Sequence, residues 1–432
     1  MKLSARVAAP LAALVLAGLT ATACAPSSSG GGAEEDTKSG TVRVWLFREV
    51  NNKPKERIVD DVVTDFEQEH DGVSVDVQYI PVDSRAEKIK GALNDPSSAP
   101  DLIEFGNTDT AGYVADGGLA DITEEFEAWD AARDTDPTAR ESVTVDGKVY
   151  GAPFFVGVRA LYYRTDVFRE LGLKPPRTLA ELAETAREIR SEKPGMYGLA
   201  VGGAYTYGAL PFLWAHGGEL ATRQGGEFTA AVDSAAARRG IKAWTALFGE
   251  DNCPPDTCAQ MGGNDTVEAF TSGKAGMVIG GDFNRQAMED GEVRGDYAVV
   301  PLPGVEEGEI APAFAGGNNL GVMRSSTHRT LAVDLLKDLA GKETQERLFA
   351  EMGFLPTFGD TRKKAAAREP FVEPFIRTLE AGAEFVPATP AWAEIDAAQV
   401  LPVMFQEIVS GKKSVDEAAG DAARAMDEVF AR

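Results

Sequence analysis

The stretch TVRVWLF, at Thr41–Phe47, begins a pattern of alternating strands and helices that sets the fold class. Its alternating, β-branched residues predict a strand, as do VSVDVQYI at Val73–Ile80 and DLIEF at Asp101–Phe105. Apolar residues at helical spacing, within 58–66 and 89–93, predict a helix between each pair of strands. This alternation indicates a parallel sheet with right-handed crossovers, and therefore an α/β fold.

The N-terminus has the pattern of an export signal. Lys2 and Arg6 precede a short apolar run at Val7–Leu19, and the small residues Ala21-Thr22-Ala23 lead to Cys24. We therefore predict a signal peptide at 1–23. A cysteine at this place resembles a bacterial lipobox, which implies that Cys24 is lipidated and anchors the exported protein to the outer face of the cell membrane.

The Ser/Gly-rich stretch after Cys24 predicts a flexible linker over 24–40. Ala21 stands where a lipobox usually has leucine, so an ordinary signal peptide that ends near a cysteine is the alternative. No later segment is apolar enough to span a bilayer. The lipid is then the expected contact with the membrane.

Size and charge narrow the function further. About 410 residues remain after the signal, more than the roughly 250–300 at which a single core stops growing, so two domains are expected. The net charge of −25 argues against a nucleic-acid partner, because such a surface repels phosphate backbones.

Three cysteines are present, and Cys253 and Cys258 are the pair left after Cys24. Export favours oxidation, and the Pro254-Pro255 turn would bring the two cysteines together, so we predict a disulfide. A metal site is the alternative, but no other cysteine or nearby histidine completes a ligand set. We expect no metal and no cofactor.

Six segments, in order, resemble the extracellular solute-binding proteins of bacterial carbohydrate ABC importers. The first is the opening strand with its helix ending in Phe66-Glu67-Gln68-Glu69. The others are PDLIEFGNT at Pro100–Thr108, YGAPFF at Tyr150–Phe155, LYYRTDVF at Leu161–Phe168, GLKPPRTLAEL at Gly172–Leu182 and AFTSGKAGM at Ala269–Met277.

The resemblance implies a two-lobed, periplasmic-binding-protein-like α/β fold of type II, with a hinge and a ligand cleft between the lobes. The N-terminal lobe is expected over 41–151 plus 313–356, and the C-terminal lobe over 152–312 plus 357–432. Extended segments near 151–155 and 300–303 would be the hinges, which absorb backbone rotation as the lobes close.

Ligands of open α/β sheets lie beyond the carboxyl ends of the strands. In the first lobe this predicts ligand contacts from three groups of residues: Phe47, Arg48 and Glu49; Asn107 and Asp109; Gly317, Asn318 and Asn319. A solvated surface pair is the alternative for Arg48 and Glu49, and a plain turn is the alternative for the glycine–asparagine segment.

The second lobe supplies aromatic candidates, because aromatic rings pack on the apolar faces of sugars. Relatives carry stacking aromatics where this chain has Trp392, placed in a loop by its prolines, and Phe283, which replaces a usual Trp. Asp282 is a candidate hydroxyl acceptor, and Trp214 a further ring. Phe155 and Arg159 lie near the expected hinge, where Arg159 could bind a carboxylate or a diol. Core packing is the alternative for Trp392 and Trp214, and a structural ion pair for Arg159.

The sequence therefore predicts a monomeric receptor, not an enzyme, which delivers a disaccharide or short oligosaccharide to the permease subunits of an ABC transporter. A binding protein for another solute, such as glycerol phosphate or a polyamine, is the alternative. A secreted glycosidase is a remote alternative that would need two opposed carboxylates. Glu104 is a poor candidate for such a role because it falls inside a short strand.

Overall fold

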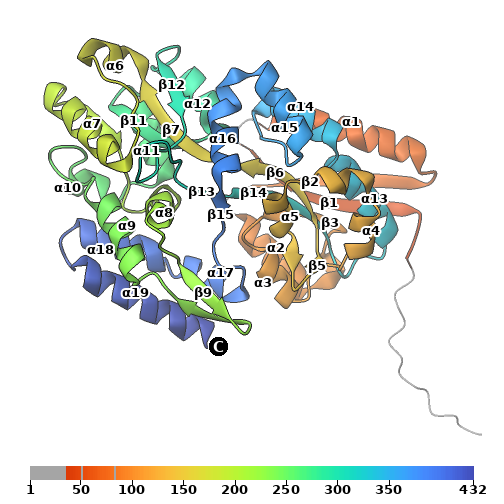
Figure 1. Cartoon of the computed structure of the whole chain (residues 1–432). Coiled ribbons are helices and arrows are strands. Elements are labelled where there is room, and N and C mark those ends of the chain that lie inside the picture. The colour runs from red at the N-terminus through yellow and green to blue at the C-terminus, as the bar shows by residue number, and fades with distance from the viewer. Residues whose placement is uncertain (1–35, 50–51, 82–83) are drawn as a thin grey trace, which may run out of the picture. The chain divides into compact units, whose positions relative to one another are not determined.

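Two separate mixed sheets organise the chain in a computed structural model that describes residues 36–49, 52–81 and 84–432 (Figure 1). The predicted signal peptide, Cys24 and most of the predicted linker lie outside the described residues. The first sheet has the order β2-β1-β3-β14-β6 and the second the order β12-β7-β11-β8. This mixed α/β, two-lobed architecture is the fold class that the sequence predicted.

The first sheet combines three early strands with two later ones. They are β1 (Gly40–Phe47), β2 (Val73–Ile80), β3 (Leu102–Gly106), β6 (Ala152–Gly157) and β14 (Gly316–Val322). β1 is parallel to β2 and β3, whereas β14 lies antiparallel between β3 and β6. The carboxyl ends of β1, β2 and β3 consequently meet at one edge, where β14 begins.

The second sheet is formed by β7 (Arg159–Arg164), β8 (Tyr197–Ala200), β11 (Ala275–Gly281) and β12 (Tyr297–Val300). β7 is antiparallel to both β11 and β12, and β8 is parallel to β11. Gly281 pairs with Arg159, so the end of β11 and the start of β7 lie at the same edge of this sheet. The described residues also form three small strand pairs: β4 (Thr144–Val145) with β5 (Lys148–Val149), β9 (Ala221–Gln224) with β10 (Glu227–Ala230), and β13 (Ala313–Phe314) with β15 (Ala383–Glu384).

Helices connect these strands, and Figure 1 shows α1, α13 and α14 beside the first sheet and α6, α7 and α11 beside the second. The helices up to β6 are α1 (Lys53–Glu69), α2 (Arg85–Asn94), α3 (Thr110–Ala115), α4 (Thr123–Glu127) and α5 (Pro137–Glu141). Those from β7 to β12 are α6 (Thr165–Leu171), α7 (Leu179–Glu192), α8 (Thr206–Ala215), α9 (Ala235–Thr245), α10 (Pro255–Cys258), α11 (Gly263–Thr271) and α12 (Arg285–Asp290). After β14 come α13 (Arg329–Leu339), α14 (Lys342–Met352), α15 (Gly359–Arg368), α16 (Glu373–Ala381), α17 (Pro390–Ala397), α18 (Val400–Val409) and α19 (Val415–Phe430). Short 3-10 turns lie at Pro96–Ser98, Asp130–Asp134, Asp282–Asn284 and Pro370–Val372.

Local signals in the sequence agree with these bounds. Thr178 caps α7 by accepting a hydrogen bond from the Glu181 backbone N–H at 3.1 Å, and Glu181 Oε2 accepts a hydrogen bond from the Arg177 backbone N–H at 2.9 Å. Asp146 and Gly147 both have positive φ in the turn between β4 and β5, which is the backbone geometry that a two-residue type I′ hairpin turn requires. Cys253 and Cys258 are joined by a disulfide within the buried core, with their Cα atoms 6.0 Å apart.

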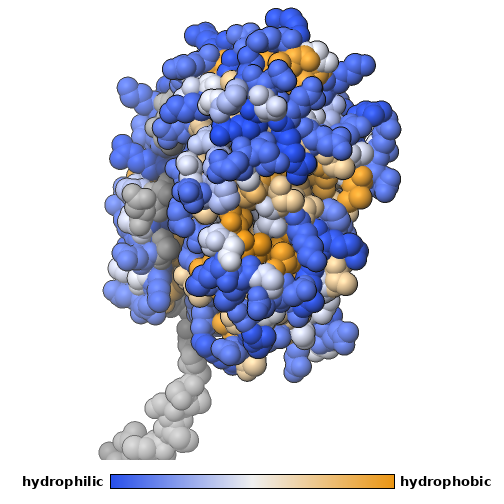
Figure 2. Space-filling model, turned by 90° about the vertical axis from the view of Figure 1, so that its left-hand side faces the viewer, coloured by the Kyte–Doolittle hydropathy of each residue, from blue (hydrophilic) through white to orange (hydrophobic). Residues whose placement is uncertain are grey.

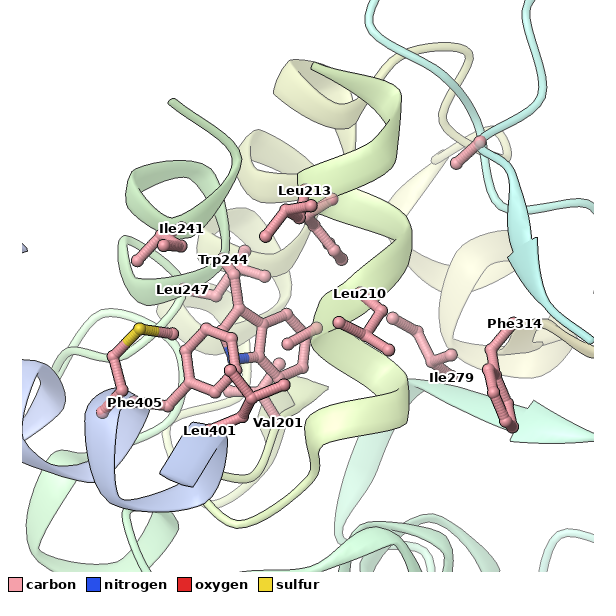
Figure 3. Close-up of a cluster of buried hydrophobic side chains, with 14 of the residues drawn as sticks. Val201, Leu210, Leu213, Ile241, Trp244, Leu247, Ile279, Phe314, Leu401 and Phe405 are labelled. Atoms are coloured by element: carbon pink, nitrogen blue, oxygen red, sulfur yellow. The ribbon is translucent and has the colours of Figure 1, made fainter. Parts of the chain in front are cut away.

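Each sheet has its own hydrophobic core. Val42, Val44 and Leu46 of β1 pack with Ile58 and Val59 of α1 in the first. In the second, Trp244 of α9 lies among Leu213 of α8 and Leu401 and Phe405 of α18 (Figure 3). A third cluster includes Val156, Val158, Tyr162, Leu355 and Phe375. Val156 and Val158 lie where the chain leaves the first sheet for the second. The residues of each core therefore come from segments that are distant in sequence.

The predicted boundaries need adjustment at the passages between sheets. β6 belongs to the first sheet through Gly157, so the chain changes sheet at Val158 rather than at Ala152. On the return, β12 ends at Val300 and the first sheet resumes at Gly316, whereas Ala313 and Phe314 pair with β15 instead. A further passage runs past Leu355, whose backbone pairs with Val156.

The surface is mainly hydrophilic. Figure 2 shows one face of the molecule on which hydrophilic residues surround a hydrophobic patch near the middle. Of the helices in the described ranges, none combines the length and apolar character needed to cross a bilayer.

Candidate functional site

The site is built from the ends of strands in both sheets. Phe47 ends β1 and is followed by Arg48 and Glu49, and Asn107–Asp109 follows β3. From the second sheet, Arg159 begins β7, and Asp282 and Phe283 follow β11. The predicted residues lie at strand ends because the chain turns there, and side chains beyond the sheet can contact a ligand.

Arg159 is the centre of an aromatic cluster. Its guanidinium carbon lies 5.8, 5.4, 5.5 and 5.9 Å from the ring centres of Tyr205, Tyr207, Phe283 and Phe314. Its Nε donates a hydrogen bond to the Tyr205 hydroxyl at 3.0 Å. We call these five residues the Arg159 cluster. Four rings around a planar cation hold the guanidinium in place and present aromatic faces together with N–H donors.

Two carboxylates adjoin this cluster, Asp109, which is half-buried, and Asp396, which is exposed at the surface. Burial raises the pKa of Asp109 to about 6, with Arg85 lowering it and Asp396 raising it. Desolvation also raises the pKa of Asp396. The pKa of Tyr207 is raised to about 12, mainly by burial, and it is influenced by Asp396, Arg159, Asp109 and Arg85. These charged groups are therefore close enough to interact with one another and with a ring of the cluster.

The helices bring the two carboxylates together. Asp109 immediately precedes α3, and Asp396 lies in α17, which packs against α3. Aromatic faces, carboxylates and guanidinium groups in one place are the chemical groups that bind the apolar faces and the hydroxyls of a sugar.

A buried ion pair lies below the loop that follows β1. Lys55 Nζ is 2.8 Å from Glu104 Oε2 and donates a hydrogen bond to the Phe47 carbonyl oxygen at 2.9 Å. Glu104 also accepts hydrogen bonds from the Phe47 backbone N–H at 2.7 Å and from Asn318 Nδ2 at 2.6 Å. Burial raises the pKa of Glu49, whose Oε1 is 3.4 Å from Lys55 Nζ. Glu49 and Asn318, both predicted as ligand contacts, are thus joined by the same pair.

Several predicted contacts have structural partners instead. Asn319 is buried and bonded to Ser142, and Asn107 Nδ2 donates to the Ala315 carbonyl oxygen at 2.8 Å. Phe155 stacks on Phe354 with ring centres 4.2 Å apart. Gly317 has φ +132° and a Cβ there would lie 2.2 Å from the Phe155 carbonyl oxygen, so glycine is required for this close approach.

Asp282 is not placed as a hydroxyl acceptor. It is 1 % exposed, and its Oδ1 accepts a hydrogen bond from the Val158 backbone N–H at 2.7 Å. Its Oδ2 is buried without a hydrogen-bond partner among the described residues. Burial raises the pKa of Asp282 to about 7. The side chain therefore ties the end of β11 to the point where the chain changes sheet.

Trp392 also differs from its prediction. It lies in α17 rather than in a loop, because Thr389 caps this helix and Pro390 takes its first turn, where a proline is tolerated. The side chain is 3 % exposed and packs in the second core, so core packing describes it in this structure. Trp214 lies in α8 and packs against the same core. Arg48 is exposed beyond β1.

The sequence reasoning missed five residues that the structure adds to the site: Arg85, Tyr205, Tyr207, Phe314 and Asp396. Tyr205 and Tyr207 follow β8, so the strand-end rule that selected Asn107 could have found them. Phe314 stacks on Tyr207 with ring centres 4.4 Å apart, and Arg85 packs on Phe47. Nothing local in the sequence marks Asp396 or Arg85, because helix packing brings them to the site.

A cavity of about 310 Å³ lies beside Asn107. It is lined by the loop after β3, by α5 and β4, by the β9–β10 hairpin and by residues 383–388. Its volume is in the range of small-ligand pockets, yet Asn107 is the one predicted contact that lines it. A cavity of about 10 Å³ adjoins Phe155 and Asn319. The Arg159 cluster carries the chemistry expected for a sugar, so we take that cluster, rather than the larger cavity, as the candidate site.

Within the described part of the chain, no three His, Cys, Asp or Glu side chains are grouped as a metal site would need.

Comparison with known proteins identifies a matching family and several similar proteins. The model of the family described as bacterial extracellular solute-binding protein matches residues 52–346. The chain is similar to the diacetylchitobiose binding protein DasA of Streptomyces coelicolor, with 25 % identity covering 94 % of this chain and 95 % of that protein. It is also similar to a galactooligosaccharide-binding protein of Bacillus subtilis, with 24 % identity covering 94 % and 93 %.

Among solved structures, the sugar-binding protein MalE of Xanthomonas citri superimposes with a TM-score of 0.79. The identity is 25 %, and the match covers 91 % of this chain and 98 % of that chain.

Proposed function

Because the chain belongs to the family of bacterial extracellular solute-binding proteins, we propose that it is the sugar-binding receptor of an ABC importer. It captures a disaccharide or short oligosaccharide outside the cell and delivers it to membrane permease subunits. The observation that carries the proposal is the Arg159 cluster, in which aromatic rings and a guanidinium lie next to the carboxylates of Asp109 and Asp396.

The chemistry of the cluster suits an uncharged, hydroxyl-rich ligand. Rings such as Phe283 and Tyr207 pack on the C–H faces of a pyranose, while carboxylates and guanidinium N–H groups bind its hydroxyls. Asp109 comes from the first lobe and Arg159 from the second. A ligand held by both would favour closure of the lobes about the passages at Val158 and Leu355.

The names of the relatives support a sugar over the other solutes. One relative binds diacetylchitobiose and another galactooligosaccharide. The carboxylates at the site would also suit a polyamine, whereas glycerol phosphate would meet Asp109, Asp396 and Glu49 as repelling charges. We propose that the protein binds without turnover.

The proposed receptor is exported and held at the membrane by lipid on Cys24. The signal-like run before Cys24 and the family's extracellular setting support this proposal. A Cys24→Ser variant should be released from the membrane fraction, whereas retention there would contradict lipid anchoring. We also propose that the receptor acts as a monomer.

A thermal-shift panel tests the function. The mature protein is mixed with chito-, galacto-, malto-, xylo- and cello-oligosaccharides, with spermidine and with glycerol phosphate. A binding sugar at a hundredfold excess over its Kd should add about 2.7 kcal/mol to the free energy of unfolding. The sugar should remain intact by chromatography. A shift with spermidine or glycerol phosphate alone would contradict the proposal that the ligand is a sugar. Cleavage of the sugar would contradict the proposal that the protein binds without turnover.

A further inference from the structure

The ion pair of Lys55 and Glu104 is unusual for its complete burial. Both side chains are 0 % exposed, and such residues are rarely found in a protein interior. Burying two charges is costly, and a buried pair is weak evidence for stability, so its presence calls for another explanation.

The ion pair forms hydrogen bonds to residues at the end of β1 and in β14, next to the part of the site that the first lobe supplies. Lys55 comes from α1 and Glu104 from β3. Glu104 accepts from the Phe47 backbone N–H and from Asn318 Nδ2, while Lys55 donates to the Phe47 carbonyl oxygen and to Glu49. The two charges therefore hold β1, α1, β3 and β14 at the point where the strands meet.

The remaining polar atoms are those that a ligand could use. Glu49 uses its Oε1 on Lys55, and its Oε2 has no partner among the described residues. Asn318 uses its Nδ2 on Glu104, and within the same residues its Oδ1 has no partner. The network thus fixes one end of each polar group and leaves one acceptor on each.

We propose that Lys55 and Glu104 are positioning residues for ligand binding, which orient Glu49 and Asn318 as hydrogen-bond acceptors for sugar hydroxyls. This inference rests on the proposed function and adds two residues that do not themselves touch the ligand. The alternative is that the pair contributes only to packing of the first lobe.

The charges that face Glu49 influence its pKa, so this pKa reports whether the ion pair acts on the Glu49 carboxylate. They are Lys55 from α1, Glu104 from β3 and Arg85 from α2. Lys55 and Arg85 lower the pKa of Glu49, and Glu104 raises it. Lys55→Met should therefore raise the pKa of Glu49, and Glu104→Gln should lower it.

The experiment follows the Glu49 carboxyl by ¹³C NMR in the mature protein, with Glu49→Gln to assign its signal. This titration needs no sugar, so its result is independent of whether the proposed function holds. Opposite movements of the Glu49 pKa in the two variants are expected. No movement, or movement in the same direction, would overturn the proposal.

Affinity is then measured across pH with a sugar from the panel. Ionised Glu49 accepts hydroxyl hydrogens better, so affinity should fall as the pH drops through the Glu49 pKa. This fall should occur at higher pH in Lys55→Met and at lower pH in Glu104→Gln. At pH 7, Lys55→Met should bind about tenfold more weakly, the size expected for a lost charge-assisted hydrogen bond.

Matched controls separate these effects from general damage. Lys364→Met and Glu346→Gln make the same changes in an ion pair 3.0 Å apart whose side chains are 57 % and 28 % exposed, and they should leave the pH profile unchanged. If Lys55→Met does not fold, the double variant Lys55→Met/Glu104→Leu removes both charges and should recover stability. It should still bind about tenfold more weakly; wild-type affinity in this variant would refute the positioning role.

Discussion

The guanidinium carbon of Arg159 lies 5.5 Å from the centre of the Phe283 ring, and that ring is 43 % exposed. Among the described residues, Phe283 and Val403 are the large apolar side chains that remain exposed. A ring that is fixed by a cation on one side and open to solvent is suited to stack on a ligand.

Phe283→Ala should weaken sugar binding about tenfold or more, because truncating an aromatic contact at the centre of a site commonly costs more than 1 kcal/mol. Phe283→Trp should retain binding, since the indole offers a larger face. Val403→Ala on α18 is the matched control and should bind as the wild type does. Isothermal titration calorimetry measures all three, and equal Kd values for Phe283→Ala and the wild type would remove Phe283 from the site.

Asp282 should make the stability of the protein depend on pH. Burial raises its pKa from 3.8 to about 7 in the folded protein, so folding favours the protonated form. The stabilisation is complete below the unfolded pKa and is lost as the pH rises through about 7. Thermal denaturation between pH 4 and 8 should show this loss in the wild type.

Asp282→Asn keeps an acceptor for the Val158 backbone N–H but cannot ionise. The difference in melting temperature between variant and wild type should therefore change in favour of the variant as the pH rises from 4 to 8. A difference that stays constant over this range would show that Asp282 does not titrate there.

Trp392→Ala should act on stability first. The side chain is 3 % exposed in the second core, and removal of a core tryptophan typically costs about 3–5 kcal/mol. Urea unfolding of the variant and the wild type measures this loss. A loss below 1 kcal/mol together with abolished sugar binding would instead support the ligand-stacking role that the sequence suggested.

Local patterns predicted the early part of the first sheet well. Alternating residues at Thr41–Phe47 and the apolar helix after them were sufficient for β1 and α1, because these elements are stabilised by neighbours in sequence. The insertion of β14 between β3 and β6 had no local signal, since its pairing depends on segments far away in the chain.

The site was predictable where it follows strands and unpredictable where helix packing forms it. Phe283 lies close to Arg159 because the end of β11 and the start of β7 are at the same edge of the second sheet. Asp396 instead comes close to Asp109 because α17 packs on α3. In the sequence, Lys55 lies among other charged residues at the start of a helix, where a lysine is usually exposed to solvent. The structure shows instead that it is buried against Glu104.

The position of β14 also bears on how the protein is made. Asn318 and its partner Glu104 are 214 positions apart, so β14, which lies between β3 and β6 in the first sheet, is synthesised long after both of these strands. Until it arrives, β3 and β6 have open edges, and closing so long a loop slows folding. The first sheet is therefore incomplete until the chain has been made at least as far as Val322, where β14 ends.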